Sequence, residues 1–156
     1  MLLFLSTFEN KIDKKGRVSV PAPFRSELER SNFNSIIVFP HPDLNCIEVW
    51  DRERLSRYAE GMDDLAPMSA EYDFASTLMS KSRPLTFDGE GRVSLPETML
   101  EQVGIDGELV FAGRGQTFQI WSPENIAKFD AEADARVAQS PQRIRLAPRR
   151  NGDGNG

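Results

Sequence analysis

The stretch Asp13-Lys14-Lys15-Gly16-Arg17-Val18-Ser19-Val20-Pro21 occurs a second time, as Asp88-Gly89-Glu90-Gly91-Arg92-Val93-Ser94-Leu95-Pro96. Six of the nine positions are identical. The similarity continues downstream in the same order, with Val38-Phe39 matched to Val110-Phe111 and Ile47–Trp50 matched to Phe118–Trp121. The offset falls from 75 to 72 to 71 residues, and it changes in segments 31–35 and 41–45, where loops are expected. The sequence therefore predicts two copies of one structural unit.

The sequence of each copy predicts the same order of elements: a strand, a helix, two strands and a second helix. The segment around Lys11 to Val20 alternates as a strand does, and a turn at Gly16 interrupts it. Pro21 and Pro96 each begin a short helix. The remaining predicted elements are helices at 22–30 and 97–103, strands at 35–40, 46–50, 108–112 and 117–121, and capped helices at 52–60 and 125–137. A further helix is predicted between the copies at 67–82, capped by Ser69, with an apolar stripe formed by Tyr72, Phe74, Ala75, Leu78 and Met79.

The composition is that of a globular protein, with 39% hydrophobic and 28% charged residues. The net charge of −5 is unevenly distributed, because residues 1–60 carry nine basic and nine acidic side chains and the acidic excess lies in residues 61–156. A single cysteine, Cys46, excludes an internal disulfide and a cysteine-based metal cage. The apolar start, Met1 to Leu5, has no basic flank and is too short for a signal or membrane segment, so a cytoplasmic location is expected.

The repeated pattern Asp-x-x-Gly-Arg-Val-Ser-[Val/Leu]-Pro resembles the MraZ family of bacterial regulators, which belongs to the AbrB-like group. The resemblance depends on Asp13, Gly16, Arg17 and Pro21, and on Asp88, Gly91, Arg92 and Pro96. It implies an α+β fold, a swapped-hairpin β-barrel formed by two tandem β-α-β-β-α repeats of one chain with a connecting helix. The expected parts are a first module at 7–54, connecting helices at 55–82, a second module at 83–126, a helix at 127–140 and a flexible tail at 141–156.

The resemblance also implies a function. It implies a sequence-specific, nucleoid-associated DNA-binding repressor of the division and cell-wall gene cluster, including its own operon. The family binds short direct repeats in double-stranded DNA and assembles into ring-shaped homo-oligomers. The apolar residues Leu2 to Leu5 need cover, which a neighbouring subunit could supply.

The residues favoured for DNA contact are basic and lie on or near the first repeated loop: Lys11, Lys14, Lys15, Arg17 and Arg25. A structural role, locking the turn, is assigned to Asp13, Gly16, Asp88, Gly91 and Arg92. An aspartate four residues before each arginine can pair with it across the turn, and a guanidinium paired on one side can still donate to DNA. Because Gly89-Glu90 replaces Lys14-Lys15, only the first copy is expected to touch DNA.

No catalytic set is visible in the sequence. His41 is the only histidine, and Cys46 is expected to be a small buried side chain rather than a nucleophile. Gly113-Arg114-Gly115 is better explained as a hairpin turn than as a phosphate loop, and Trp50 and Trp121 as core or interface anchors. No cofactor, metal, membrane or small-molecule substrate is therefore expected. The alternative functions are a protein-interaction scaffold or antitoxin-like module without direct DNA recognition, and an enzyme that uses His41 or Cys46.

Overall fold

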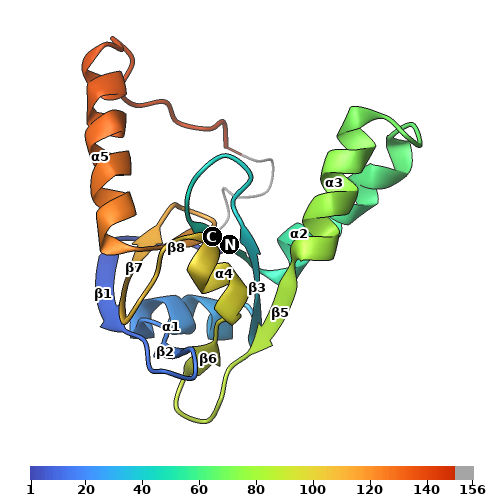
Figure 1. Ribbon diagram of the computed structural model, residues 1–156. Helices are drawn as coiled ribbons and strands as arrows, with labels where there is room; N and C mark the ends of the chain where they lie inside the picture. The colour runs from blue at the N-terminus through green and yellow to red at the C-terminus, as the bar shows by residue number, and fades with distance from the viewer. Residues whose placement is uncertain (150–156) are drawn as a thin grey trace. The chain divides into compact units, whose positions relative to one another are not determined.

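The computed structural model describes residues 1–149, and Figure 1 shows its helices and strands in chain order. The first copy contains β1 (Thr7–Lys11), β2 (Arg17–Ser19), α1 (Ala22–Arg30), β3 (Ser35–Pro40), β4 (Ile47–Trp50) and α2 (Arg52–Gly61). The connection contains a 3₁₀ helix (Met62–Asp64) and α3 (Ala70–Lys81). The second copy contains β5 (Arg83–Thr86), β6 (Arg92–Ser94), α4 (Glu97–Gln102), β7 (Glu108–Gly113), β8 (Phe118–Trp121) and α5 (Pro123–Ala138).

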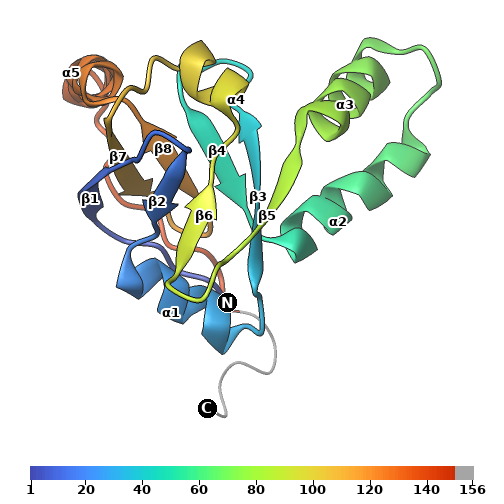
Figure 2. The same cartoon turned by 60° about the horizontal axis from the view of Figure 1, so that its bottom comes forward.

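The two copies exchange their first hairpins. A six-stranded antiparallel sheet has the order β1-β7-β8-β4-β3-β5, so β1 of the first copy pairs with β7 of the second, and β5 of the second pairs with β3 of the first. Strands β2 and β6 pair only with each other and form a separate two-stranded ribbon, which lies beside the sheet in Figure 2. The predicted α+β swapped-hairpin fold from two tandem repeats is confirmed.

Strand registers place equivalent residues of the two copies opposite each other. In the ribbon Val18 lies opposite Val93, and at the centre of the sheet Glu48 lies opposite Gln119. These pairs are separated by 75 and 71 residues, the offsets found in the sequence for these segments. The two copies are therefore related by an approximate twofold axis that passes through both pairs.

The proposed match of Val38-Phe39 with Val110-Phe111 is wrong by one residue. Phe8 lies opposite Phe111 in the sheet. Arg83, the residue of the second copy that is equivalent to Phe8, lies opposite Val38. Val38 and Phe111 are therefore equivalent positions of the two copies. Neighbouring strand residues point to opposite faces, so a shift of one residue exchanges core and outer positions. Val38 and Phe111 both belong to the main core cluster, whereas Val110 does not.

The main core lies between the inner face of the sheet and the ribbon. Val18 and Val93 of the ribbon point into it, beside the phenylalanines of α1, β8 and the N-terminal segment. The ring centroids of Phe4, Phe24 and Phe118 lie 4.7 to 5.2 Å apart. Aromatic rings at these separations contribute favourable edge and face contacts in addition to their buried area. This core fixes the ribbon on the sheet.

The N-terminal segment is covered by its own chain at two of the four predicted positions. Leu2 and Phe4 are buried, whereas Leu3 and Leu5 are 51% and 60% exposed. Phe4 exchanges backbone hydrogen bonds with Gly115, and the chain then enters β1 at Thr7, four residues before the predicted strand began. Leu2 and Phe4 thus receive from their own chain the cover that they were expected to need, and the exposed Leu3 and Leu5 do not.

The predicted helices and their caps agree closely with the structure. The side chains of Asp51, Ser69 and Ser122 accept hydrogen bonds from backbone amides at the starts of α2, α3 and α5. These bonds satisfy amides that have no partner inside the helix. On α3, Ala75 and Leu78 are buried as predicted, but Phe74 is half exposed, because α3 packs against β3 with only a narrow stripe.

Residues 1–126 form one compact unit, and the described residues from Ala127 onward form a second. Most of α5 lies in the second unit, followed by residues 139–149, which form no regular helix or strand. The predicted flexible tail extends to residue 156, so its last seven residues lie outside the described part of the chain. Within residues 1–149, no helix has the length and apolar character needed to cross a bilayer.

We expect Gly16→Ala to lower the free energy of unfolding by about 2 kcal/mol or more. Gly16 has φ +80°, and a Cβ atom there would lie 2.7 Å from the carbonyl oxygen of Leu95. The matched control is Gly89→Ala, because a Cβ atom at Gly89 meets nothing within 4 Å, and its effect should stay below about 0.5 kcal/mol. Urea unfolding at one protein concentration measures both, and equal effects would contradict the turn geometry.

Candidate nucleic-acid interface

The repeated motif forms an aspartate-anchored turn before β2. One carboxylate oxygen of Asp13 accepts hydrogen bonds from the amides of Lys15 and Arg17, both at 2.9 Å, and the other accepts one from Arg17 Nε at 2.7 Å. The amide of Gly16 donates to the carbonyl of Asp13 at 3.0 Å. A residue at φ +80° is needed to close this turn, which explains the glycine.

The turn before β6 repeats this geometry. Asp88 accepts from the amides of Glu90 and Arg92 at 2.9 and 3.0 Å, and from Arg92 Nε at 2.9 Å. Gly91 takes the place of Gly16, with φ +76°. The predicted pairing of aspartate with arginine across each turn is therefore present in both copies.

Each turn is also attached to the other copy. The amide of Leu95 donates to the carbonyl of Gly16 at 2.8 Å, and the amide of Val20 donates to the carbonyl of Gly91 at 3.2 Å. The backbone pairing of β2 with β6 thus continues at each end of the ribbon, where the turn of one copy bonds to the residue that follows the other copy's strand. This arrangement fixes the position of the two arginines relative to each other.

Both arginines lie on the outer face of the ribbon. Val18 and Val93 point into the core, so their neighbours along each strand point outward. Arg17 lies opposite Ser94, and Ser19 lies opposite Arg92. We call these four residues the ribbon face. The two serines were not predicted to belong to the interface. The alternation within each Arg-Val-Ser segment indicates that the serine lies on the same face as the arginine.

The two arginines differ in the donors they leave free. Arg92 bonds to Asp88 through Nε, and its terminal nitrogen lies 3.3 Å from Glu90, so two carboxylates neutralise it. The hydrogen bond that Arg92 donates to Asp88 is the main reason that the pKa of Arg92 is raised. Arg17 bonds to Asp13 alone, through Nε, and within residues 1–149 its terminal nitrogens have no hydrogen-bond partner. Arg17 can therefore donate to a ligand with its planar fork.

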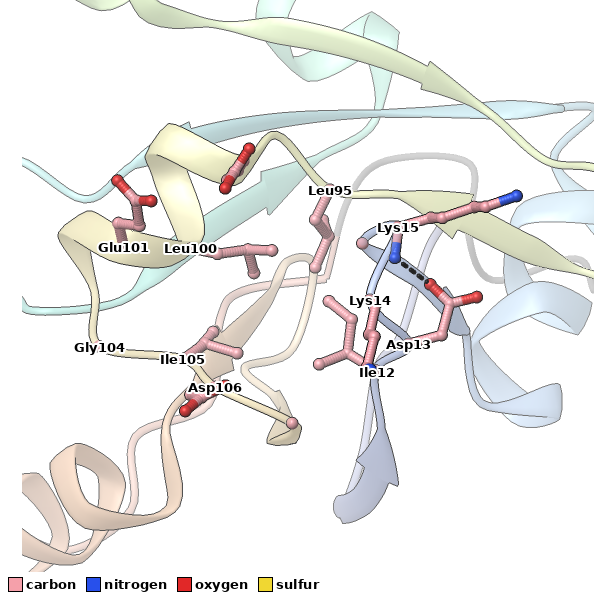
Figure 3. A pocket seen from close by; sticks show the side chains of 13 residues that line it. Ile12, Asp13, Lys14, Lys15, Leu95, Leu100, Glu101, Gly104, Ile105 and Asp106 are labelled. Atoms are coloured by element: carbon pink, nitrogen blue, oxygen red, sulfur yellow. Dashed lines mark hydrogen bonds between the residues drawn. The ribbon is translucent and has the colours of Figure 1, made fainter.

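Lys14 and Lys15 are exposed at the tip of the first loop, and Lys11 is exposed at the end of β1, opposite Glu108. The loop borders a cavity of about 630 Å³ whose opposite wall carries acidic side chains that the sequence analysis did not associate with it: Glu97, Glu101 and Asp106. In Figure 3, Lys15 extends away from Glu101. Within the described chain, no ion pair joins these lysines to the acidic wall.

Arg25 does not lie with the first loop, where it was predicted to join the basic cluster. Its Nε donates to the carbonyl of Val20 at 3.0 Å, and its side chain packs over Gly91 of the second loop. The exchange of hairpins explains the difference, because α1 of the first copy packs beside the second loop. The first loop lies instead beside α4, where Leu100 occupies the position equivalent to Arg25.

Other candidate groups have structural roles. Cys46 is fully buried, and burial raises the pKa of its thiol to about 12, so the nucleophilic thiolate is scarce at neutral pH. His41 Nδ1 accepts hydrogen bonds from the amides of Asp43 and Leu44, and its Nε2 lies 3.5 Å from the buried Glu48. The predicted hairpin turn is present: β7 ends at Gly113, and residues 114–117 connect it to β8, with the amide of Arg114 donating to the carbonyl of Thr117. Within residues 1–149 there is no cluster of three possible metal ligands.

The comparison with known proteins identifies the family. A family described as "MraZ protein, putative antitoxin-like" matches residues 3–73 and 78–146, the two copies of the repeat. The chain belongs to the MraZ family. Relatives named transcriptional regulator MraZ include a Pelagibacter ubique protein, 45% identical over 84% of this chain and 85% of the relative. Those of Rickettsia bellii and Rickettsia africae are 42% and 40% identical, covering 85% and 83% of this chain and 90% and 87% of the relatives.

We expect Asp88→Asn to lower stability at neutral pH and to flatten its pH dependence between about pH 5 and pH 3. Hydrogen bonds from the amides of Arg92 and Glu90 hold the pKa of the Asp88 carboxyl below its usual 3.8, and the amide of Arg17 does the same for Asp13. A depressed carboxyl pKa contributes stability above the unfolded pKa, which is lost as the pH falls through the folded pKa.

Urea unfolding at several pH values measures this effect. The control is Asp63→Asn, because Asp63 is exposed and makes no ion pair within the described chain. The control should keep the pH dependence of the unchanged protein. An Asp88→Asn protein with an equally steep loss of stability in acid would show that the carboxylate does not anchor the turn.

Proposed function

We propose that the chain is a sequence-specific DNA-binding transcriptional regulator that contacts double-stranded DNA with Arg17 of the ribbon face and with the first loop. The observation that carries the proposal is Arg17, whose terminal nitrogens point from a rigid turn with no partner within residues 1–149. Such a fork can donate two hydrogen bonds to a guanine edge or a phosphate. The relatives named as transcriptional regulators support the same function.

The finer features of the proposal follow the family resemblance. The chain acts as a repressor of the division and cell-wall gene cluster, including its own operon, and is associated with the nucleoid in the cytoplasm. It binds short direct repeats as a ring-shaped homo-oligomer, so that modest contacts at several first loops add up through avidity. Exposed apolar side chains, Leu3, Leu5 and Phe74, support a contact between subunits.

The first copy is proposed to make the main contact. Lys14 and Lys15 add two exposed cations beside Arg17, and the equivalent positions of the second loop are Gly89 and Glu90. DNA carries a dense row of phosphate charges, so the carboxylate of Glu90 disfavours approach of the second loop. Arg25, which packs over the second loop, is proposed as a peripheral phosphate contact, and Lys11 as another beside the first.

Arg17→Ala should weaken binding to the operator by roughly 1–3 kcal/mol per engaged loop, with a smaller effect on unrelated DNA. Arg92→Ala should lower the melting temperature or perturb assembly, while its assembled fraction still binds the operator. Mobility-shift titrations against the region upstream of the chain's own operon measure both. An assembled Arg92→Ala protein that has lost operator binding, beside an Arg17→Ala protein that has kept it, would contradict the proposal.

Lys14→Ala and Lys15→Ala should weaken binding to every DNA sequence alike, because their ammonium groups contact phosphates. The slope of log affinity against log salt should fall by about one per lost contact per loop. Titrations on operator and unrelated duplexes over a range of salt concentrations measure the slopes. A loss restricted to the operator would indicate base contacts instead.

The second candidate function is binding of a partner protein, and the antitoxin-like description of the family favours it. The cavity beside the first loop, with lysines on one wall and carboxylates on the other, is a suitable surface for a charged peptide segment. The two functions differ in the mobility shift. A partner-binding module would not discriminate its operator from unrelated DNA.

A further inference from the structure

The segment from the last turn of α5 onward differs in charge from the rest of the chain. Residues 135–152 form the longest stretch without an acidic residue, and they contain no lysine and five arginines, of which Arg136 lies in α5. Residues 1–141 carry 15 basic and 23 acidic side chains, a net charge of −8. The cations of this segment are thus separated along the chain from the acidic surface that would neutralise them.

The described arginines of this segment are available to a ligand. Arg143, Arg145 and Arg149 are exposed, and residues 142–149 form no helix or strand. Arg143 donates to the carbonyls of Val137 and Ser140 at the end of α5, and so anchors the start of the segment. Within residues 1–149, Arg145 and Arg149 make no hydrogen bond or ion pair.

The chemistry of this segment suits phosphate groups on an extended polyanion. Arginine remains charged at all physiological pH values and binds phosphate oxygens with two parallel hydrogen bonds. An extended, basic, acid-free arm can follow a nucleic-acid backbone without a preformed pocket, because the contact requires charge and reach rather than shape. A membrane anchor would need a continuous apolar face, and this segment has no helix to form one.

We propose that residues 142–149 form a second DNA-binding element, an arginine arm that contacts backbone phosphates without reading base sequence. The proposal rests on DNA binding as the function of the chain and adds to it a separate source of affinity. The ribbon face would then discriminate between sequences, and the arginine arm would strengthen binding to all of them. Arm and ribbon face are therefore distinguishable by experiment.

The test compares two triple variants of the full-length chain that lose the same charge. The arm variant carries Arg143→Gln, Arg145→Gln and Arg149→Gln. The control carries Arg52→Gln, Arg57→Gln and Arg83→Gln, which replaces three exposed arginines of α2 and β5. Affinities for operator DNA and for an unrelated duplex of equal length are measured over a range of salt concentrations, and binding to vesicles containing phosphatidylserine is measured in parallel.

The arm variant should lose affinity for both duplexes by the same factor, and its salt slope should fall by up to about three, one for each phosphate contact. The control should keep a steeper slope than the arm variant. Equal slopes for the two variants would overturn the proposal, and so would an arm variant that loses vesicle binding but keeps its DNA slope. Failure of the proposed function looks different, because the unchanged chain would then bind operator and unrelated DNA equally well.

Discussion

Neither arginine turn is complete without the other copy of the repeat. The amide of Leu95 bonds to the carbonyl of Gly16, and the amide of Val20 bonds to the carbonyl of Gly91, so each turn is held by the opposite strand of the ribbon. A side chain at Gly16 would collide with the backbone that makes this bond. This reciprocal contact joins the two copies and gives both arginines a common orientation.

The symmetry of the backbone contrasts with the asymmetry of the charges. Two aspartates hold two arginines in the same geometry, but only Arg92 has a second carboxylate, Glu90, at its terminal nitrogen. The helix beside each loop carries charges of the opposite sign: the basic first loop lies beside acidic side chains of α4, and the acidic second loop lies beside Arg25 of α1. In the proposed function the first loop contacts an anionic ligand, and the second loop has a structural role only. This proposed division rests on side chains alone, since the two backbones match.

Local features of the fold could be predicted from the residues themselves, whereas the exchange of hairpins was predicted only through the family resemblance and its detailed contacts were not predicted. Repetition, turn chemistry and capping predicted the aspartate turns and the bounds of α1 and β3, because each depends on residues a few positions apart. The equivalence of Val38 and Phe111 in the two copies could not be predicted, since an alignment shifted by one residue also places apolar residues together. The position of Arg25 beside the second loop could not be predicted for a related reason: the sequence does not show beside which copy's loop a helix packs. The acidic wall of the cavity was missed because it approaches Lys14 and Lys15 only after the hairpins exchange.

Site-directed cross-linking tests the central claim, that DNA is contacted by the first loop more than by the second. Lys15→Cys and Glu90→Cys introduce thiols at equivalent positions, and the native Cys46 does not compete, because it is buried and its pKa is raised to about 12. Each variant is labelled with the same short photoactivatable reagent, bound to operator DNA and irradiated, and the cross-linked fraction is measured. We expect a several-fold higher yield from position 15. A yield from position 90 that equals or exceeds it would show that the second loop contacts DNA at least as closely as the first.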